Sequence, residues 1–314
     1  MLSTRYHRRD WIKRTTALLA CTPAVMRSQE TGRRELAATE LSFLDELERR
    51  SFRYFREASS DITGQVKDRS LADGKDDREI ASIAATGFGL TALCIGHQRA
   101  YDDRETIRER VRITLDWLAN HQPNEHGFFY HFFNMHTGAR VWSCELASID
   151  TSILLCGVLT CHSYFEDADI QRLARKIYER VDWNWMRNGG KTVTHGWKPE
   201  SGFLEARWGH YCELMMIYLL GLGSPSHPLP ATCWNAWSRP MMEYSGLEYI
   251  SGRDPLFVHQ FSHAWFDFRG RRDSDIDWFQ NSVTATKAHR QFCMGMQERF
   301  PMYGPKLWGI TASD

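Results

Sequence analysis

The sequence lacks an excess of either charge and lacks cysteines or histidines at metal-binding spacing. Its 314 residues carry 39 basic and 39 acidic side chains, so there is no basic field to attract nucleic acid. Its eight cysteines form no C-x-x-C motif and no Cys/His cluster at zinc spacing. We therefore expect no nucleic-acid partner, no metal and no other cofactor. Cys94, Cys156 and Cys161 lie in apolar helical runs and are predicted to be buried free thiols.

The N-terminal segment is basic and then briefly apolar. Residues 8–13 read R-R-D-W-I-K, and the apolar run from 15 to 21 completes a resemblance to a twin-arginine export signal. Residues 1–30 are thus predicted to be an export signal, with a lipid anchor at Cys21 if the signal is processed as in lipoproteins. A basic, unstructured leader is the alternative. No other apolar segment reaches the roughly 18 residues that span a bilayer. The predicted location is periplasmic, outer-membrane-associated or secreted.

After a polar linker at 31–40, amphipathic and apolar helical patterns alternate along residues 41–314. The amphipathic patterns predict outer helices over about 40–58, 104–120 and 169–180. The apolar patterns predict inner helices that open near residues 82, 148 and 211, which gives a period close to 65 residues. A hairpin is predicted over 127–133 and 141–142, and a fourth unit over 230–239 and 261–269.

This alternation predicts an all-α fold in which the inner helices are parallel, an (α/α)6 toroid with short β-hairpins in its mouth loops. Six units at this period need roughly 390 residues, so we expect about four of the six, with the domain at 41–314 truncated at its C-terminus. An ordinary helical bundle is the alternative. In a toroid, the loops before the inner helices gather at one mouth.

Those loops are rich in tryptophan and acid, which is typical of a carbohydrate site. The chain has 12 Trp, and aromatic faces stack on pyranose rings while carboxyl groups act on the glycosidic oxygen. Glu213 is predicted in the first turn of the third inner helix, behind Trp197 and Trp208. The alternative is that Glu213 only complements the helix dipole.

Candidate residues at the mouth fall into two groups. Glu213, Asp150 and Glu145 are the catalytic candidates. Sugar-binding candidates, by hydrogen bonding or stacking, are Asp68, Arg69, Trp142, Trp197, Lys198, Trp208, Tyr211, His263, Trp265 and Asp267. For the charged members of the second group, a solvated loop or a structural ion pair is an equal alternative.

Eight motifs together resemble one known family. They are S-I-A-A-T-G-F-G-L-T-A-L at 82–93, G-F-F-Y-H-F at 127–132, E-L-A-S-I-D-T at 145–151, V-D-W-N-W-M at 181–186, G-W-K-P-E at 196–200, L-G-S-P-S-H-P-L-P at 222–230, Q-F-S-H-A-W-F-D-F-R-G at 260–270 and Y-G-P-K-L-W-G-I-T-A-S-D at 303–314. In this order, over about residues 42–314, the chain resembles the bacterial glucoamylase-like family, which includes the endo-β-1,2-glucanases of glycoside hydrolase family 144.

The resemblance implies an exported bacterial enzyme that hydrolyses β-glucan with inversion, with Glu213 as general acid and Asp150 and Glu145 as active-site partners. It also implies a general base beyond residue 314. The spacing of the carboxyl groups along the sequence does not distinguish inversion from retention. Two rival functions remain at this point: a truncated remnant that binds glycan without cleaving it, and a polysaccharide lyase. The lyase is disfavoured because the mouth loops are not rich in Arg.

Overall fold

The computed structural model describes residues 35–71, 73–252, 255–274 and 276–311. The chain divides into two compact units, residues 1–47 and 48–314. The predicted export signal and Cys21 lie outside the described residues. In the predicted linker, residues 35–37 have no regular structure, and helix α2 (Ala38–Glu57) begins within it and runs into the second unit. The helix predicted over 40–58 is confirmed.

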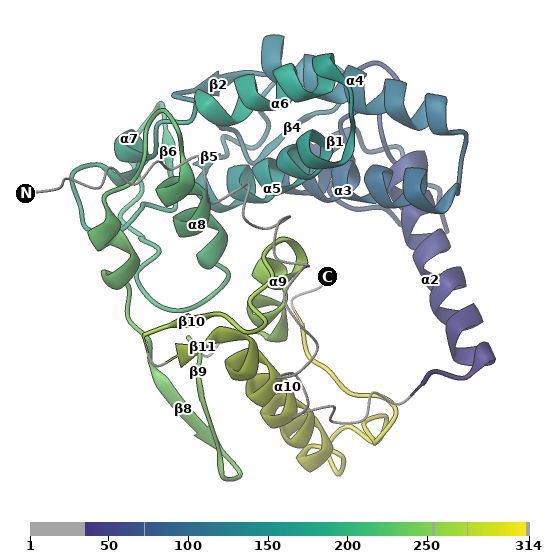
Figure 1. The fold of residues 1–314 in the computed structure, drawn as a ribbon, viewed down its shortest axis with the longest axis vertical. Coiled ribbons are helices and arrows are strands. Elements are labelled where there is room, and N and C mark those ends of the chain that lie inside the picture. Colours follow the sequence, from purple (N-terminus) through teal and green to yellow (C-terminus); the bar gives the residue numbers. More distant parts are fainter. Residues whose placement is uncertain (1–34, 72, 253–254, 275, 312–314) are drawn as a thin grey trace, which may run out of the picture. The chain divides into compact units, whose positions relative to one another are not determined.

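The second unit is mainly helical, and its first helices match the predicted pattern. The amphipathic helices α4 (Arg104–Asn120) and α6 (Ala168–Glu179) each bury one apolar face, as Ile170, Leu173 and Ile177 of α6 show. The apolar helices α3 (Ile83–Arg99), α5 (Ser148–Tyr164) and α8 (Met215–Gly223) alternate with α2, α4 and α6 along the chain, and α5 packs beside both α3 and α8 (Figure 1). The alternation of amphipathic and apolar helices is therefore correct up to residue 223.

Helices α3 and α5 are parallel and closely packed, because glycines face each other where they meet. A Cβ atom on Gly157 would lie 2.1 Å from the carbonyl oxygen of Gly87, so no larger residue fits without moving a backbone. Further along both helices, Cys94 Sγ lies 3.6 Å from Cys161 Sγ, and His97 Nδ1 lies 2.8 Å from the Tyr164 hydroxyl. Both pairs are 67 residues apart, which is the spacing of one repeat.

The fourth unit differs from the prediction. Residues 231–235 form only a 3-10 helix, η1 (Ala231–Asn235), and the expected inner helix near 261 is the short α9 (Phe261–Trp265). It stops there because the next residues turn: the Asp267 carboxylate accepts a hydrogen bond from the Arg269 amide, and Gly270 has φ +68°. The long fourth helix is α10 (Trp278–Gly295), capped by Asp277. The long apolar helices and α10 thus begin at 83, 148, 215 and 278, at intervals of 65, 67 and 63 residues.

Short strands occupy the loops before these helices. They are β1 (Ile80–Ser82), β2 (Asn124–Glu125), β3 (Phe128–Phe129), β4 (Phe132–Asn134), β5 (Leu146–Ala147), β6 (Gly196–Lys198), β7 (Gly202–Phe203), β8 (Met241–Tyr244), β9 (Leu247–Ile250), β10 (Arg272–Asp273) and β11 (Ile276–Asp277). The predicted hairpin is present as a short antiparallel return: the Val141 amide donates to the Phe132 carbonyl at 3.2 Å and the Asn134 amide to the Ala139 carbonyl at 2.8 Å, on either side of the Phe133–Arg140 bridge. Its first strand, β4, also pairs with β1, which was not predicted. A further 3-10 helix, η2 (Leu256–His259), and the short α7 (Trp183–Arg187) complete the described elements.

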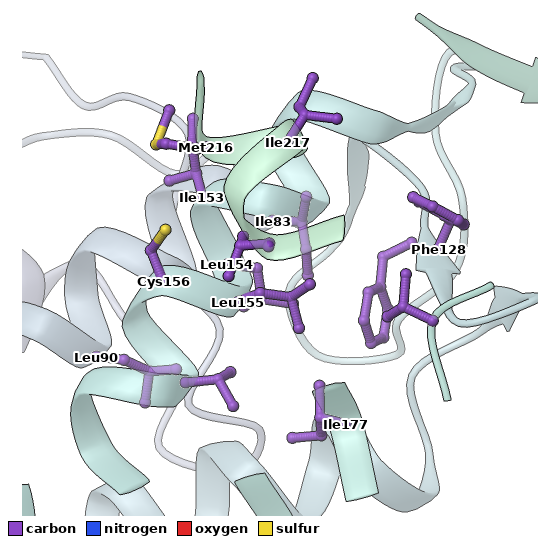
Figure 2. Packing of buried hydrophobic residues seen from close by; sticks show 14 of the residues in the cluster. Ile83, Leu90, Phe128, Ile153, Leu154, Leu155, Cys156, Ile177, Met216 and Ile217 are labelled. Carbon is purple, nitrogen blue, oxygen red and sulfur yellow. The ribbon is translucent and has the colours of Figure 1, made fainter. Parts of the chain in front are cut away.

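The core lies between the apolar helices. Figure 2 shows side chains of α3, α5 and α8 in one cluster, among them Ile83, Leu154 and Ile217, each of which is fully buried. The cysteines of the described residues are free and buried, which confirms the prediction for Cys94 and Cys161. In this described part of the chain, no helix has both the length and the apolar character that a membrane span requires.

Candidate active site

An imidazole ring lies between two carboxylates where three loops meet. His131 follows β3, Glu145 directly precedes β5, and Asp150 lies in the first turn of α5. His131 Nδ1 is 3.1 Å from Glu145 Oε1, and His131 Nε2 is 3.5 Å from Asp150 Oδ1. We call these three residues the carboxylate–imidazole cluster.

The backbone fixes the imidazole on both sides. The His131 amide donates to the Glu145 carbonyl at 2.9 Å, and the Ile83 amide at the start of α3 donates to the His131 carbonyl at 3.1 Å. The ring of Phe132 stacks on the imidazole with centroids 3.7 Å apart. His131 therefore has little freedom to turn away from either carboxylate.

Each member of the cluster has a shifted pKa. Burial raises the pKa of Asp150, whose side chain is only 13% exposed. The hydrogen bond from His131 lowers the pKa of Glu145. Burial by itself disfavours a charged His131, but the hydrogen bond to Glu145 and the charges of Asp150 and Glu145 outweigh burial and raise the pKa of His131. The ring is thus favoured as an imidazolium between its two partners.

Trp208 connects this cluster to the loop before α8. Its indole Nε1 donates to Ser148 Oγ at 2.8 Å at the start of α5, and its ring stacks on His195 at 4.1 Å. The Tyr218 hydroxyl in the first turn of α8 donates to the Trp208 carbonyl at 2.7 Å. The first turns of α5 and α8 are therefore joined through one tryptophan.

Glu213 lies in the turn just before α8, which begins at Met215. The sequence predicted Glu213 one to two residues further inside the helix. Assigned helix ends commonly differ by one or two residues. The side chain of Glu213 is half-buried, and its carbonyl accepts a hydrogen bond from Ser262 Oγ of α9 at 3.3 Å. Glu213 thus lies on the same loop as Trp208, whose indole bonds to Ser148 at the start of α5.

The other predicted charged residues surround the cluster at different distances. Asp68 pairs with its neighbour Arg69 at 2.6 Å, and its charge acts on both His131 and Asp150. Lys198 of β6 helps to lower the pKa of Glu145. Asp267 lies apart from them: it is exposed, and its ion pair with Arg269 holds its pKa at about 2.

The predicted tryptophans have different surroundings. Trp142 is 66% exposed, in a left-handed backbone conformation with φ +55°, and its edge meets Phe132, which stacks on His131. Trp197 of β6 is half-buried against Trp185. Trp265 of α9 donates from its indole to Thr91 Oγ1 of α3 at 3.0 Å. Trp142 is thus the most accessible of the four predicted stacking platforms.

Two predicted sugar-binding residues have packing roles in this structure. Tyr211 is 1% exposed; its ring stacks on Trp278 with centroids 5.4 Å apart, and its hydroxyl lies 3.1 Å from His259 Nδ1. A side chain enclosed in this way has no surface for a sugar. His263 Nε2 is 2.9 Å from Ser282 Oγ of α10, so its outer nitrogen joins α9 to α10.

His131 and His195 were not predicted as site residues. A sequence signal existed for His131, because it lies in the 127–132 motif just ahead of an inner helix, where the other candidates were sought. Its position beside the two carboxylates depends on the Tyr130–Leu146 bridge and on the hydrogen bond from its amide to the Glu145 carbonyl, which no local pattern encodes. His195 is brought in by the antiparallel pairing of β6 with β5.

The site is not a metal centre within the described residues, where no group of three or more Cys, His, Asp or Glu side chains has the geometry to hold a metal ion. A cavity of about 570 Å³ lies elsewhere, lined by residues such as Tyr249, His259 and Phe292, and none of its lining residues belongs to the cluster. The cluster is the better candidate site, because the described residues that line the cavity include no carboxylate.

Comparison with known proteins identifies relatives for this chain. Residues 205–314 match the family model "Putative glucoamylase". A curated relative, the exo-β-1,2-glucooligosaccharide sophorohydrolase (non-reducing end) of Parabacteroides distasonis, is 24% identical over 91% of this chain. The chain spans 44% of that relative's length.

Several solved structures of other proteins have a fold similar to that of this chain. The endo-β-1,2-glucanase of Chitinophaga pinensis, in complex with sophorotriose and glucose, has a TM-score of 0.81 at 24% identity, covering 89% of this chain and 72% of its own. A putative glucoamylase of Bacteroides fragilis has a TM-score of 0.80 at 28% identity, with coverage of 90% and 73%. The β-1,2-glucanase of Parabacteroides distasonis has a TM-score of 0.78 at 21% identity, with coverage of 89% and 45%. The likeness to glucoamylase-like proteins and β-1,2-glucanases that the motifs indicate is confirmed.

Proposed function

We propose that this glucoamylase-like chain belongs to a glycoside hydrolase that cleaves β-1,2-glucan at the mouth formed by the loops before α5 and α8. The observation that carries the proposal is the carboxylate–imidazole cluster at the start of α5, in a fold close to that of an endo-β-1,2-glucanase. Three of the relatives named above carry a β-1,2-glucan or β-1,2-glucooligosaccharide substrate in their names. The lengths of the oligosaccharides released in the assay distinguish endo from exo action.

The architecture we propose is an (α/α)6 toroid of which this chain supplies about four units. Support comes from the parallel packing of α3 on α5 and from helix starts at 83, 148, 215 and 278. Parallel inner helices direct their N-termini to one mouth. That arrangement would bring Asp150 and Glu213 to the same end of the barrel, where Trp208 already joins the first turns of α5 and α8.

In this proposal Glu213 is the general acid that protonates the leaving glycosidic oxygen. Asp150 and Glu145 bind sugar hydroxyls and stabilise the positive charge that develops in the oxocarbenium-like transition state. Trp142 offers its exposed face to a glucose ring. Inversion requires about 6.5–9.5 Å between acid and base carboxyl groups, to leave room for the attacking water, and the base is assigned to no residue of this chain.

We further propose that residues 1–30 direct export, so that the enzyme works in the periplasm, on the outer membrane or outside the cell. The support is the twin-arginine sequence at 8–13 and the apolar run that ends at Cys21. Mass spectrometry of the protein purified from its cell envelope tests this: cleavage before Cys21 with an added lipid mass supports an anchor, and an intact Met1 refutes export processing.

The hydrolase proposal is tested by Glu213→Gln, measured on the 314-residue chain and on any longer product of the same reading frame. The amide is nearly isosteric but has no proton to give, so kcat for β-1,2-glucan should fall about 10²- to 10⁴-fold. Exposed Glu248, on the β8–β9 hairpin, supplies the control Glu248→Gln with native kcat expected. Released oligosaccharides are measured by chromatography. Glucan that binds but is not cleaved by any native form would instead favour a binding remnant.

A further inference from the structure

We propose that His131 is the positioning residue of the site: as an imidazolium it bridges Glu145 and Asp150 and holds both carboxylates in their working orientation. The inference deepens the proposed function and rests on it for the substrate. The bridge itself is a property of the unliganded protein and can be measured without any substrate.

The geometry supports a bridge because the two carboxylates come from different elements and, among the described residues, His131 is the side chain that contacts both. Glu145 precedes β5, while Asp150 belongs to α5, and the ring reaches one with each nitrogen at 3.1 and 3.5 Å. A neutral imidazole has one N–H and can donate to only one carboxylate, whereas an imidazolium donates to both. When both carboxyl groups are ionised, only the charged ring therefore satisfies the two contacts together.

On balance, the charges on the surrounding elements also favour the imidazolium form of His131. Asp68, on the loop before β1, adds a negative charge that favours the imidazolium and raises the pKa of Asp150. Arg69 neutralises part of that charge by pairing with Asp68. Lys198 on β6 favours the charged form of Glu145. Burial and the nearby His210 lower the pKa of His195, and Glu145 acts on it in the opposite sense.

Loss of the proton has a predictable sign. The pKa of His131 is raised in the folded protein, so the bridge is complete below the ordinary histidine value of about 6.5 and is lost as pH rises through the folded value. Above that pH the neutral ring donates to one carboxylate only, and the other is left buried without its donor. The site should therefore lose its positioning, and part of its activity, on the alkaline side.

The first test is an NMR titration of the histidine rings in the unliganded 314-residue chain. His131, assigned by its disappearance in His131→Asn, should titrate above about 6.5. Its pKa should fall in Glu145→Gln, which removes the charge of the hydrogen-bonded partner. His97, in the last turn of α3, serves as control and should titrate alike in both proteins. A His131 that titrates at or below 6.5, or is unmoved in Glu145→Gln, overturns the bridge.

The second test compares kcat of the native protein with His131→Asn and His131→Gln across pH 5 to 9. The Asn side-chain amide keeps a neutral hydrogen-bond donor toward Glu145, and the Gln side-chain amide keeps one toward Asp150. Neither amide titrates in this pH range. At low pH, kcat of the native protein should exceed kcat of each variant by about 10²-fold, the typical cost of a misplaced catalytic group. The ratio should shrink toward unity above the His131 pKa. The ratio of native to variant kcat at each pH cancels any pH effect that the native protein and the variants share, such as the protonation of Glu213. Circular dichroism establishes that the variants fold.

The outcomes separate the inference from the proposed function. A ratio that stays constant with pH, in variants that fold, overturns the positioning role. A protein that cleaves no β-1,2-glucan, but in which His131 titrates above 6.5 and responds to Glu145→Gln, refutes the proposed function and supports the bridge. A shrinking ratio together with a raised His131 pKa supports both.

Discussion

Replacing Gly157 with alanine should destabilise the protein, although alanine favours helices. The new Cβ would lie 2.1 Å from the Gly87 carbonyl oxygen and 2.8 Å from its carbonyl carbon, whereas ordinary contact begins at 3.4 Å. The shortfall of 1.3 Å (3.4 − 2.1) falls on backbone atoms, which cannot rotate away. Helices α3 and α5 must therefore move apart along the interface that aligns the first turn of α5.

The expected magnitude follows from two opposing effects. Overpacking a well-packed core costs about 1–3 kcal/mol, and the upper part of that range applies because backbone is displaced. Alanine recovers about 1 kcal/mol of helix propensity relative to glycine. The free energy of unfolding should therefore fall by about 2 kcal/mol, a sizeable fraction of the roughly 5–15 kcal/mol that stabilises a domain.

Urea unfolding followed by far-UV circular dichroism measures this loss. The matched control is Gly223→Ala at the end of α8, where the nearest atom to the new Cβ would be the Tyr178 hydroxyl at an ordinary 3.5 Å. That variant should be as stable as the native protein or slightly more stable. If Gly157→Ala is as stable as Gly223→Ala, the close packing of α3 on α5 is not as described.

Two further predictions separate packing from sugar contact. Tyr211→Phe should lower the free energy of unfolding by about 1 kcal/mol, because the contact with His259 is lost. Its KM for β-1,2-glucan should stay within twofold of the native value, and a large rise in KM would return Tyr211 to the substrate site. Trp142→Ala should raise KM about 2- to 10-fold by removing a stacking face. Its free energy of unfolding in urea should change by no more than about 0.5 kcal/mol because the ring is exposed, and an unchanged KM would exclude Trp142 as a stacking platform.

The helical frame could be predicted from the sequence because its information is local. Apolar residues at helical spacing mark α4 and α6, and nearly continuous apolar runs mark α3 and α5. Ser82 caps α3 through its side chain, as the position of that residue before the run suggests. The period of about 65 residues follows from these starts alone.

The fourth unit and the cluster could not be predicted in the same way. The 261–269 segment has the aromatic content of an inner helix, but the turn around Asp267 and Gly270 ends α9 after five residues. His131 meets the segment that carries Glu145 through the Tyr130–Leu146 bridge and the hydrogen bond from the His131 amide to the Glu145 carbonyl, a pairing that no periodic pattern in the sequence encodes. Tyr211 looked accessible at a loop end, yet the stacking of Trp278 encloses it from the following unit.

The most direct test of the account is a crystal structure of Glu213→Gln with sophorotriose, the sugar bound by the endo-β-1,2-glucanase of similar fold. The account predicts the trisaccharide at the loops before α5 and α8, with Glu145 and Asp150 within hydrogen-bond distance of its hydroxyls and the residue 213 side chain facing a glycosidic oxygen. Sophorotriose bound away from these loops, for example in the cavity lined by Tyr249 and Phe292, would contradict it.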